Sequence, residues 1–371
     1  MNNNQSAVAP QLIKQKKDPL FHIIKRPAMP LWQSILIRVG AVAAALIFCG
    51  ILCYIMIDVN PLKFFKTMWD GVFGTERRIL KMFKDLAILL CISLAITPAF
   101  KMRFWNIGAE GQVLVSGLAC AACMKFIGGH LPEWALILIM AASSILAGAA
   151  WGLIPAIFKA KWDTNETLFT LMMNYVATYL VGYFLIKWTP DGSSTIGRLD
   201  HGHLPVIFNN QYALVILTVA LITVAMFIYL KYSKQGYEIS VVGESQRTAQ
   251  YIGINVKKVI IRTMAISGAL CGIAGLLIVG ALDHTITKVS VGGQGFTAIM
   301  VSWLAKFNPF TMILTSFLII FLQQGTDKVV SDFGINNTFP NIVTGIILFF
   351  IIGCEFFINY RIVFRKKEAK Q

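Results

Sequence analysis

The stretch Phe104–Gln112 reads FWNIGAEGQ, and the apolar run VLVSGLACAACM follows it directly at Val113–Met124. Lipid offers no partner to freed backbone groups or to a carboxylate, so glycines and charged or amide side chains are costly in a membrane helix. Asn106 and Glu110 are four residues apart and share one helical face. The stretch therefore predicts a glycine-broken membrane segment that packs against other protein or lines a water-filled path.

The composition of the whole chain supports a membrane protein. Of its 371 residues, 56% are hydrophobic and only 14% are charged, against about 25% charged in soluble domains. The apolar runs are continuous and do not alternate with period two, so we expect an all-α polytopic protein, not a barrel. About ten transmembrane helices are predicted. Eight runs are clear and the last two are short: Ile35–Ile57, Asp85–Phe100, Val113–Gly128, Trp134–Phe158, Thr167–Lys187, Gln211–Leu230, Val259–Gly280, Asn341–Tyr360, Phe296–Ala305 and Pro309–Gln324.

The formal net charge of +15 predicts an orientation in the membrane. With both termini inside, about two thirds of the Lys and Arg fall in inner segments, as cytoplasmic loops favour. We therefore expect a basic cytoplasmic segment at 1–34, a transmembrane domain at 35–360 with a cytoplasmic loop at 231–258, and a basic cytoplasmic tail at 361–371. The external loop at 62–84 is also basic, and we expect an interfacial amphipathic helix there. This distribution explains the charge without a nucleic-acid partner.

A second glycine-rich break, GGQGF, lies at Gly292–Phe296. The second to fifth predicted spans and the seventh to tenth share one layout, a long span, a polar break and three further spans. Because the two sets start on opposite sides of the membrane, they predict an inverted repeat. In transporters, paired glycine-interrupted segments indicate the substrate site.

A polar stripe runs along the helix predicted after Asn165, with Glu166, Thr170, Asn174 and Thr178 spaced by four. Such a stripe faces either a cavity or another helix through interhelical hydrogen bonds. Glu110 likewise either belongs to a functional site or pairs with polar groups of another helix in a structural role. Amides, hydroxyls and aromatic rings suit a small neutral polar solute better than a bare ion. The candidates for the solute path are Asn106, Glu110, Gln112, Glu166, Asn174, Gln294 and Phe296.

Motifs for catalysis or metal binding are weak. The sequence has no GxxxxGK[ST] phosphate loop, HExxH or GxSxG motif. Cys120 and Cys123 form a CxxC inside an apolar run, where small packing residues are the favoured interpretation. His201 and His203 lack a third ligand and are interpreted as loop surface. We therefore expect no enzyme activity, metal or cofactor in this chain.

Four ordered segments resemble permease subunits of bacterial ABC importers of the branched-chain amino acid, ribose and nucleoside group, most closely the nucleoside and simple-sugar branch. They are WNIGAEGQ at Trp105–Gln112, NETLFTLMMNYVA at Asn165–Ala177, VVGESQRTAQYIGINVKK at Val241–Lys258, and GFTAIMVSWLAKFNP at Gly295–Pro309, with LQQG shortly after. Ser245, Thr248 and the bulky SWLAK depart from the usual pattern.

The resemblance implies a division of labour in a bacterial cytoplasmic membrane. A separate ATPase would bind ATP and dock on the loop at Gly236–Lys258, where a short helix from Glu244 to Ile252 is expected to end at Gly253. The residues expected to couple to the ATPase are Gly243, Glu244, Arg247 and Gly253. A second, homologous permease and a lipid-anchored or periplasmic solute-binding protein would complete the importer.

The most favoured solute is a nucleoside, and simple sugars such as ribose or branched-chain amino acids are the alternatives. Two other classes stay open. An ion-coupled secondary transporter would need no docking loop that carries a helix, and a membrane enzyme acting on lipid or sugar-lipid substrates would be active as the purified chain alone.

Overall fold

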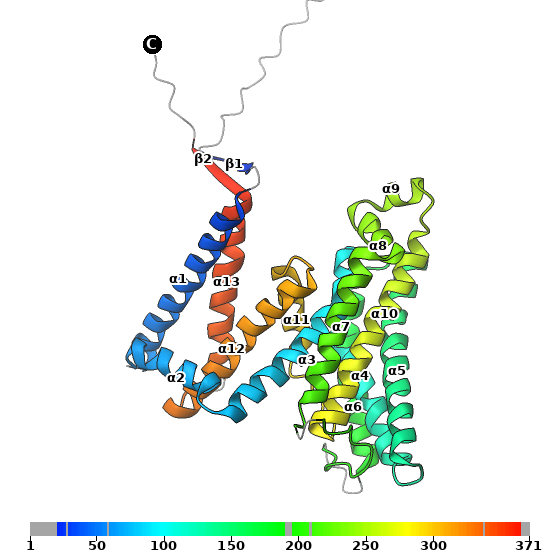
Figure 1. Cartoon of the computed structure of the whole chain (residues 1–371). Helices are drawn as coiled ribbons and strands as arrows, with labels where there is room; N and C mark the ends of the chain where they lie inside the picture. Colours follow the sequence, from blue (N-terminus) through cyan, green and yellow to red (C-terminus); the bar gives the residue numbers. More distant parts are fainter. Residues whose placement is uncertain are drawn as a thin grey trace, which may run out of the picture. The chain divides into compact units, whose positions relative to one another are not determined.

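The computed structural model describes residues 21–26, 29–57, 59–189, 195–207, 210–336 and 338–364. Almost all of the regular structure is helical (Figure 1). The elements in chain order are β1 (Phe21–Lys25), α1 (Leu31–Ile57), α2 (Pro61–Phe73), α3 (Glu76–Lys101), α4 (Ala109–Phe126), α5 (Glu133–Trp162), α6 (Glu166–Trp188), α7 (Ala213–Tyr232), α8 (Lys234–Glu244), α9 (Gln246–Tyr251), α10 (Val256–Leu276), the π-helical η1 (Leu277–Asp283), α11 (Gln294–Leu304), α12 (Pro309–Phe333), α13 (Phe339–Asn359) and β2 (Tyr360–Phe364).

The chain forms two compact units, and the first contains 1–62 and 342–371. In this unit β1 pairs antiparallel with β2, with Phe21 opposite Phe364. The Arg38 Nε of α1 donates a 2.7 Å hydrogen bond to Glu355 Oε1 of α13. Since β1 leads into α1 and β2 follows α13, the start of α1 and the end of α13 lie at the same end of this unit. The sequence analysis did not predict these strands.

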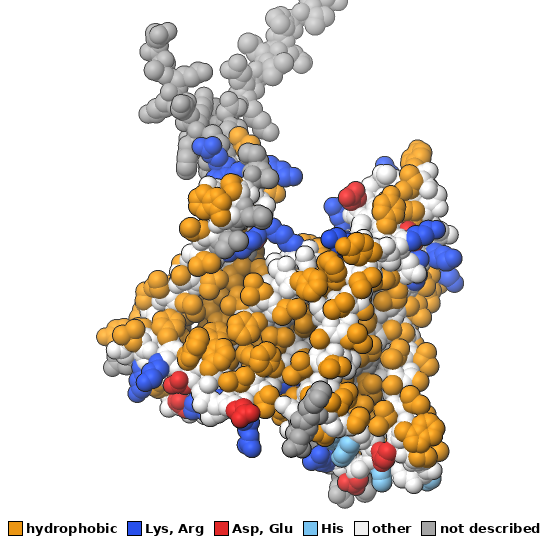
Figure 2. All heavy atoms as spheres, viewed as in Figure 1, with side chains coloured by type: hydrophobic (Ala, Val, Ile, Leu, Met, Phe, Trp, Pro, Cys, Tyr) orange, Lys and Arg blue, Asp and Glu red, His pale blue; other side chains and the backbone are white. Residues whose placement is uncertain are grey.

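The second unit, 63–341, is a helical bundle with α3 at its centre. Every residue from Leu86 to Phe100 is buried, because α10, α11, α7 and α12 all pack against α3. Apolar side chains cover the sides of this unit. Lys and Arg gather near α8 and α9 at one end, histidines lie at the other end, and further Lys and Arg lie on α2 and the start of α3 (Figure 2). Apolar sides with charged groups at the ends are typical of a membrane-embedded bundle.

Glycines allow α5 and α10 to approach closely. A Cβ atom built on Gly268 would lie 2.2 Å from the carbonyl oxygen of Gly148, and one on Gly272 would lie 2.6 Å from that of Ser144. No larger side chain fits at such separations, so the backbones touch directly, as small residues permit between membrane helices.

Among the described residues, seven helices are long and apolar enough to span a membrane: α1, α5, α6, α7, α10 with η1, α12 and α13. The prediction of an all-α polytopic membrane protein is therefore confirmed, but the count of ten spans is not. Each of the ten predicted runs lies on a helix. However, α11 has only 11 residues, about 16 Å of helix against a hydrocarbon core of about 30 Å. The inverted repeat and the domain boundaries stay predictions.

Candidate functional site: two glycine breaks and the loop at 231–258

The first break lies between α3 and α4, where the chain is not helical. Asn106 is fully buried there. Its Oδ1 accepts hydrogen bonds from Gly108 N at 3.0 Å and from Gln112 Nε2 at 3.3 Å. Its Nδ2 donates to Ser267 Oγ of α10 at 3.3 Å. The break is thus held by side chains of the protein, as its membrane setting requires.

The polar stripe of α6 faces this break. Asn174 Oδ1 accepts from Gly111 N at 2.9 Å, and Asn174 Nδ2 donates to Ile107 O at 2.9 Å. Thr170 Oγ1 accepts from Ile107 N at 3.1 Å. The stripe was predicted to face either a cavity or another helix, and these contacts match hydrogen bonding between protein segments. Asn174 and Gln112 are 5% and 1% exposed, so they support the break from within the bundle.

Glu110 joins the first break to the second. Its two carboxylate oxygens accept hydrogen bonds from Gly293 N and Gly295 N, each at 2.8 Å. Gly293 has a φ of +78°, and a Cβ on Gly295 would lie 2.5 Å from Glu110 N. The carboxylate thereby sits at the N-terminus of α11, where backbone N–H groups and the helix dipole favour a negative charge. Two segments far apart in the sequence meet at one carboxylate.

The remaining path candidates are more scattered. Gln294 Oε1 is buried and has no hydrogen-bond partner among the described residues, and Phe296 is 41% exposed. Glu166 lies at the start of α6, where its carboxylate pairs with Lys159 Nζ at 3.0 Å. Glu166 is therefore held by an ion pair with α5, and its hydrogen-bonding contacts do not include the two breaks.

The outward face of α6 is a feature that the sequence analysis missed. Tyr175, Tyr179 and Tyr183 are 57%, 73% and 59% exposed. A hollow of about 410 Å³ lies along the first half of α6, and its lining is Thr164, Asn165, Leu168, Phe169, Met172, Met173 and Val176. The spacing of four between the tyrosines was the available signal, because it places three phenol rings on one side of the helix.

The loop at 231–258 contains the short helix α9. Ser245 caps it, with Oγ accepting from Thr248 N at 3.2 Å, and Gly253 follows it with a φ of +85°. A helix is therefore present within the predicted range, but it begins at Gln246, because Glu244 still belongs to α8, and it ends at Tyr251, two residues before Gly253. At its tip Tyr251 is 93% exposed.

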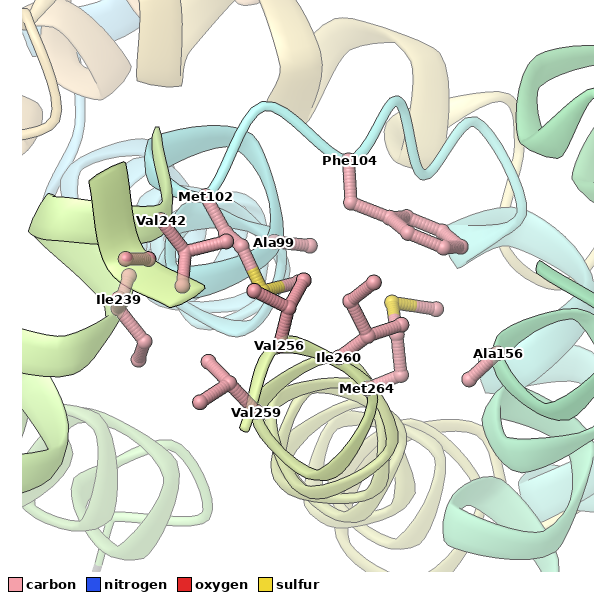
Figure 3. Close-up of a cluster of buried hydrophobic side chains, with 11 residues drawn as sticks. Ala99, Met102, Phe104, Ala156, Ile239, Val242, Val256, Val259, Ile260 and Met264 are labelled. Atoms are coloured by element: carbon pink, nitrogen blue, oxygen red, sulfur yellow. The ribbon is translucent and has the colours of Figure 1, made fainter. Parts of the chain in front are cut away.

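The loop packs tightly on the first break through a cluster of buried apolar side chains. Ile239 and Val242 of α8 lie on the side of Met102, whereas Phe104 lies on the side of Ile260 and Met264 of α10 in the same cluster (Figure 3). The cluster therefore includes residues of both the loop and the FWNIGAEGQ segment.

The four predicted coupling residues differ in their surroundings. Gly243 is buried, and a Cβ there would lie 2.1 Å from Lys101 O. Gly243 can therefore contribute only through packing of α8 on the end of α3. Glu244, Arg247 and Gly253 are exposed.

The opposite end of the bundle carries the HGH segment. The rings of His203 and His284 lie against each other with centroids 4.0 Å apart and an angle of 30° between their planes, and His203 Nε2 lies 2.7 Å from Leu199 O. Burial lowers the pKa of His284, and His203 lowers it further. His201 Nδ1 is 3.5 Å from Glu133 Oε1. Within the described ranges, no group of three or more His, Cys, Asp or Glu side chains could hold a metal.

Comparison with known proteins matches these features to transport permeases. The guanosine ABC transporter permease protein NupP of Bacillus subtilis is 30% identical over 341 residues, covering 89% of this chain and 94% of NupP. NupQ of the same organism, also a guanosine ABC transporter permease protein, is 27% identical over 55% of this chain and 67% of NupQ. The glucose ABC transporter permease protein TsgB13 of Haloferax volcanii is 26% identical, over 91% of this chain and 92% of TsgB13.

The family described as "Branched-chain amino acid transport system / permease component" matches residues 78–352. That range contains both glycine breaks, the stripe of α6 and the loop with α9. The chain belongs to this family of ABC transporter permeases.

Proposed function

We propose that this permease imports nucleosides. The observation that carries the proposal is the 30% identity to a guanosine permease along nearly the full length of both chains. A simple sugar is the second candidate, because a glucose permease is 26% identical over a similar length. The family description keeps branched-chain amino acids as a third.

We infer that the solute moves along the outward face of α6. Exposed phenol hydroxyl groups at mid-helix find no hydrogen-bond partner in lipid, so Tyr175 and Tyr179 favour a surface that faces a polar path. Flat bases stack on aromatic side chains with about 1–3 kcal/mol per base, and phenols can also bond to ribose hydroxyls. In this proposal Asn106, Glu110, Gln112, Asn174 and Gln294 border the path by holding the glycine breaks behind α6.

Partners follow from the same proposal. A second, homologous permease would face α6 across the path; one organism having both NupP and NupQ supports such a pair. A separate ATPase would bind ATP and contact α9, and an external solute-binding protein would deliver the nucleoside. The exposed ring of Tyr251 offers the ATPase an aromatic anchor of the kind that dominates interface energetics.

We propose a bacterial plasma membrane with both termini in the cytoplasm. The β1–β2 pairing supports an even number of crossings, since it joins the segments before α1 and after α13. Cysteines introduced singly at Tyr251 and at Gly197, in a cysteine-free background, test the orientation. A membrane-impermeant thiol reagent added outside should label only the second. Labelling of Tyr251→Cys alone would reverse the orientation.

Solute identity is tested by uptake into proteoliposomes that contain the assembled importer and internal ATP. Labelled guanosine should accumulate, and excess unlabelled glucose or leucine should not compete. Tyr179→Leu should lower nucleoside uptake by about fivefold or more, since a lost stacking contact of about 1 kcal/mol corresponds to that factor, whereas Tyr179→Phe should retain most of the uptake. Uptake of glucose or leucine but not guanosine would reject the nucleoside proposal.

Docking of the ATPase is tested by co-purification. Tyr251→Ala should reduce recovery of the ATPase with the permease. Tyr237→Ala is the matched control, because Tyr237 lies on α8 of the same loop and is 62% exposed. Equal recovery with Tyr251→Ala and wild type would show that α9 is not the main contact.

A further inference from the structure

A hollow of about 520 Å³ lies behind α9, on the side that faces α8 and α10. Lys234 and Glu238 of α8, Gly253 in the turn after α9, and Lys258 and Arg262 of α10 line it. A Cβ atom built on Gly253 would meet nothing within 4 Å, so the wall formed by this turn is open. The volume falls within the range of about 300–1,000 Å³ typical of small-molecule sites.

The lining carries more positive than negative charge. Lys234, Lys258 and Arg262 are cationic, and Glu238 is the acidic side chain among the lining residues. Glu238 Oε2 accepts a 2.8 Å hydrogen bond from Arg262 Nη2, which offsets one of the positive charges. The Arg262 Nε is buried and has no acceptor in the described part of the chain. The two lysines leave the hollow suited to an anion.

The position of the hollow indicates which anion it would meet. Lys234 is two residues beyond the end of α7, and Lys258 is in the first turn of α10, so both lie where membrane-spanning helices end. Tyr232 and Tyr237 are 69% and 62% exposed nearby, as aromatic side chains at the headgroup level often are. Basic pockets between membrane helices on the cytoplasmic side are suited to anionic headgroups.

We propose that this hollow binds the phosphate of an anionic phospholipid headgroup. A lipid seated there would tie α8 and the turn after α9 to the start of α10, and would thereby fix the position of the loop that packs on the first glycine break. That this lipid belongs to the cytoplasmic leaflet rests on the proposed function, which places α8 and α9 in the cytoplasm. The binding itself depends only on the hollow and is tested without the ATPase.

The experiment measures lipid retention by native mass spectrometry on the purified full-length permease, released from nanodiscs of phosphatidylglycerol and phosphatidylcholine in equal amounts. Wild type should retain phosphatidylglycerol over phosphatidylcholine. Each lysine contributes roughly a fivefold change in affinity at a lipid surface, so the double variant Lys234→Gln/Lys258→Gln should lower retention by about twentyfold or more. Lys257→Gln is the matched control, because Lys257 adjoins Lys258 but does not line the hollow.

Several results would overturn the proposal. An equal loss of phosphatidylglycerol in the Lys257→Gln control would indicate general surface attraction. Equal retention of both lipids by wild type would show that the hollow does not select an anionic headgroup. Inorganic phosphate that displaces the lipid at equimolar concentration would identify a free-anion site instead. A thermal midpoint that rises with phosphatidylglycerol in wild type and in Lys257→Gln, but not in the double variant, supports the proposal independently and shows that the double variant folds.

Discussion

Replacing Glu110 with glutamine disturbs the contact that joins the two glycine breaks. Both carboxylate oxygens accept a backbone N–H, from Gly293 and Gly295, at 2.8 Å. A glutamine side chain keeps the shape but presents one oxygen and one NH₂ group, so one backbone N–H would face another donor. A hydrogen bond to a charged group contributes about 1.5–3 kcal/mol, and Glu110→Gln should therefore lower the free energy of unfolding by about that amount. Glu110→Ala loses both bonds and should cost about twice as much.

The assay is the thermal midpoint of the purified permease in one detergent, followed by tryptophan fluorescence. Glu133→Gln is the matched control, because Glu133 also accepts a backbone hydrogen bond, from Gly202 N at 3.0 Å, but its side chain is 57% exposed. Water can replace that bond, so the control should stay within about 1 kcal/mol of wild type. We expect midpoints to fall in the order wild type, Glu133→Gln, Glu110→Gln, Glu110→Ala. A Glu110→Gln midpoint equal to that of the control would refute the reasoning.

Three further predictions concern other parts of the bundle. Gly268→Val forces α5 and α10 apart and should lower the free energy of unfolding by about 1–3 kcal/mol or more. A Cβ on Gly345 would meet nothing within 4 Å, so Gly345→Val should leave the thermal midpoint nearly unchanged. Burial, and next His203, lower the pKa of His284 below its ordinary 6.5. The fold thus favours the neutral ring. The resulting contribution to the free energy of unfolding is present above pH 6.5 and is lost as the pH falls through the lowered pKa. Thermal midpoints of wild type should therefore drop in acid, and His284→Asn should flatten that dependence. Asn174→Leu leaves two backbone groups unpaired at roughly 1–3 kcal/mol each, so uptake and thermal midpoint should fall together; lost uptake at an unchanged midpoint would instead indicate direct solute contact.

The sequence alone determined the class of the protein and the places where its helices break. The chain is 56% hydrophobic and 14% charged, and its continuous apolar runs are those of membrane helices. The conformational preference of glycine is local, so the sequence also shows where helices end. For the same reason Gly253 marked the end of α9, and the glycines near Asn106 and Gln294 marked the two breaks. The start of α9 was misplaced because Ser245 ends α8 and caps α9 at once, which neighbouring residues do not reveal.

Only the tertiary structure decided which groups meet. Helical spacing placed Thr170 and Asn174 on one face, but periodicity does not say whether that face meets a cavity or a neighbouring helix. Glu110 finds its two donors at Gly293 and Gly295, more than 180 residues along the chain, and no local pattern encodes such a distance. The number of spans was uncertain for a related reason. Hydropathy reports how apolar a segment is, but it does not tell whether the segment meets lipid or, like α3, is surrounded by other helices.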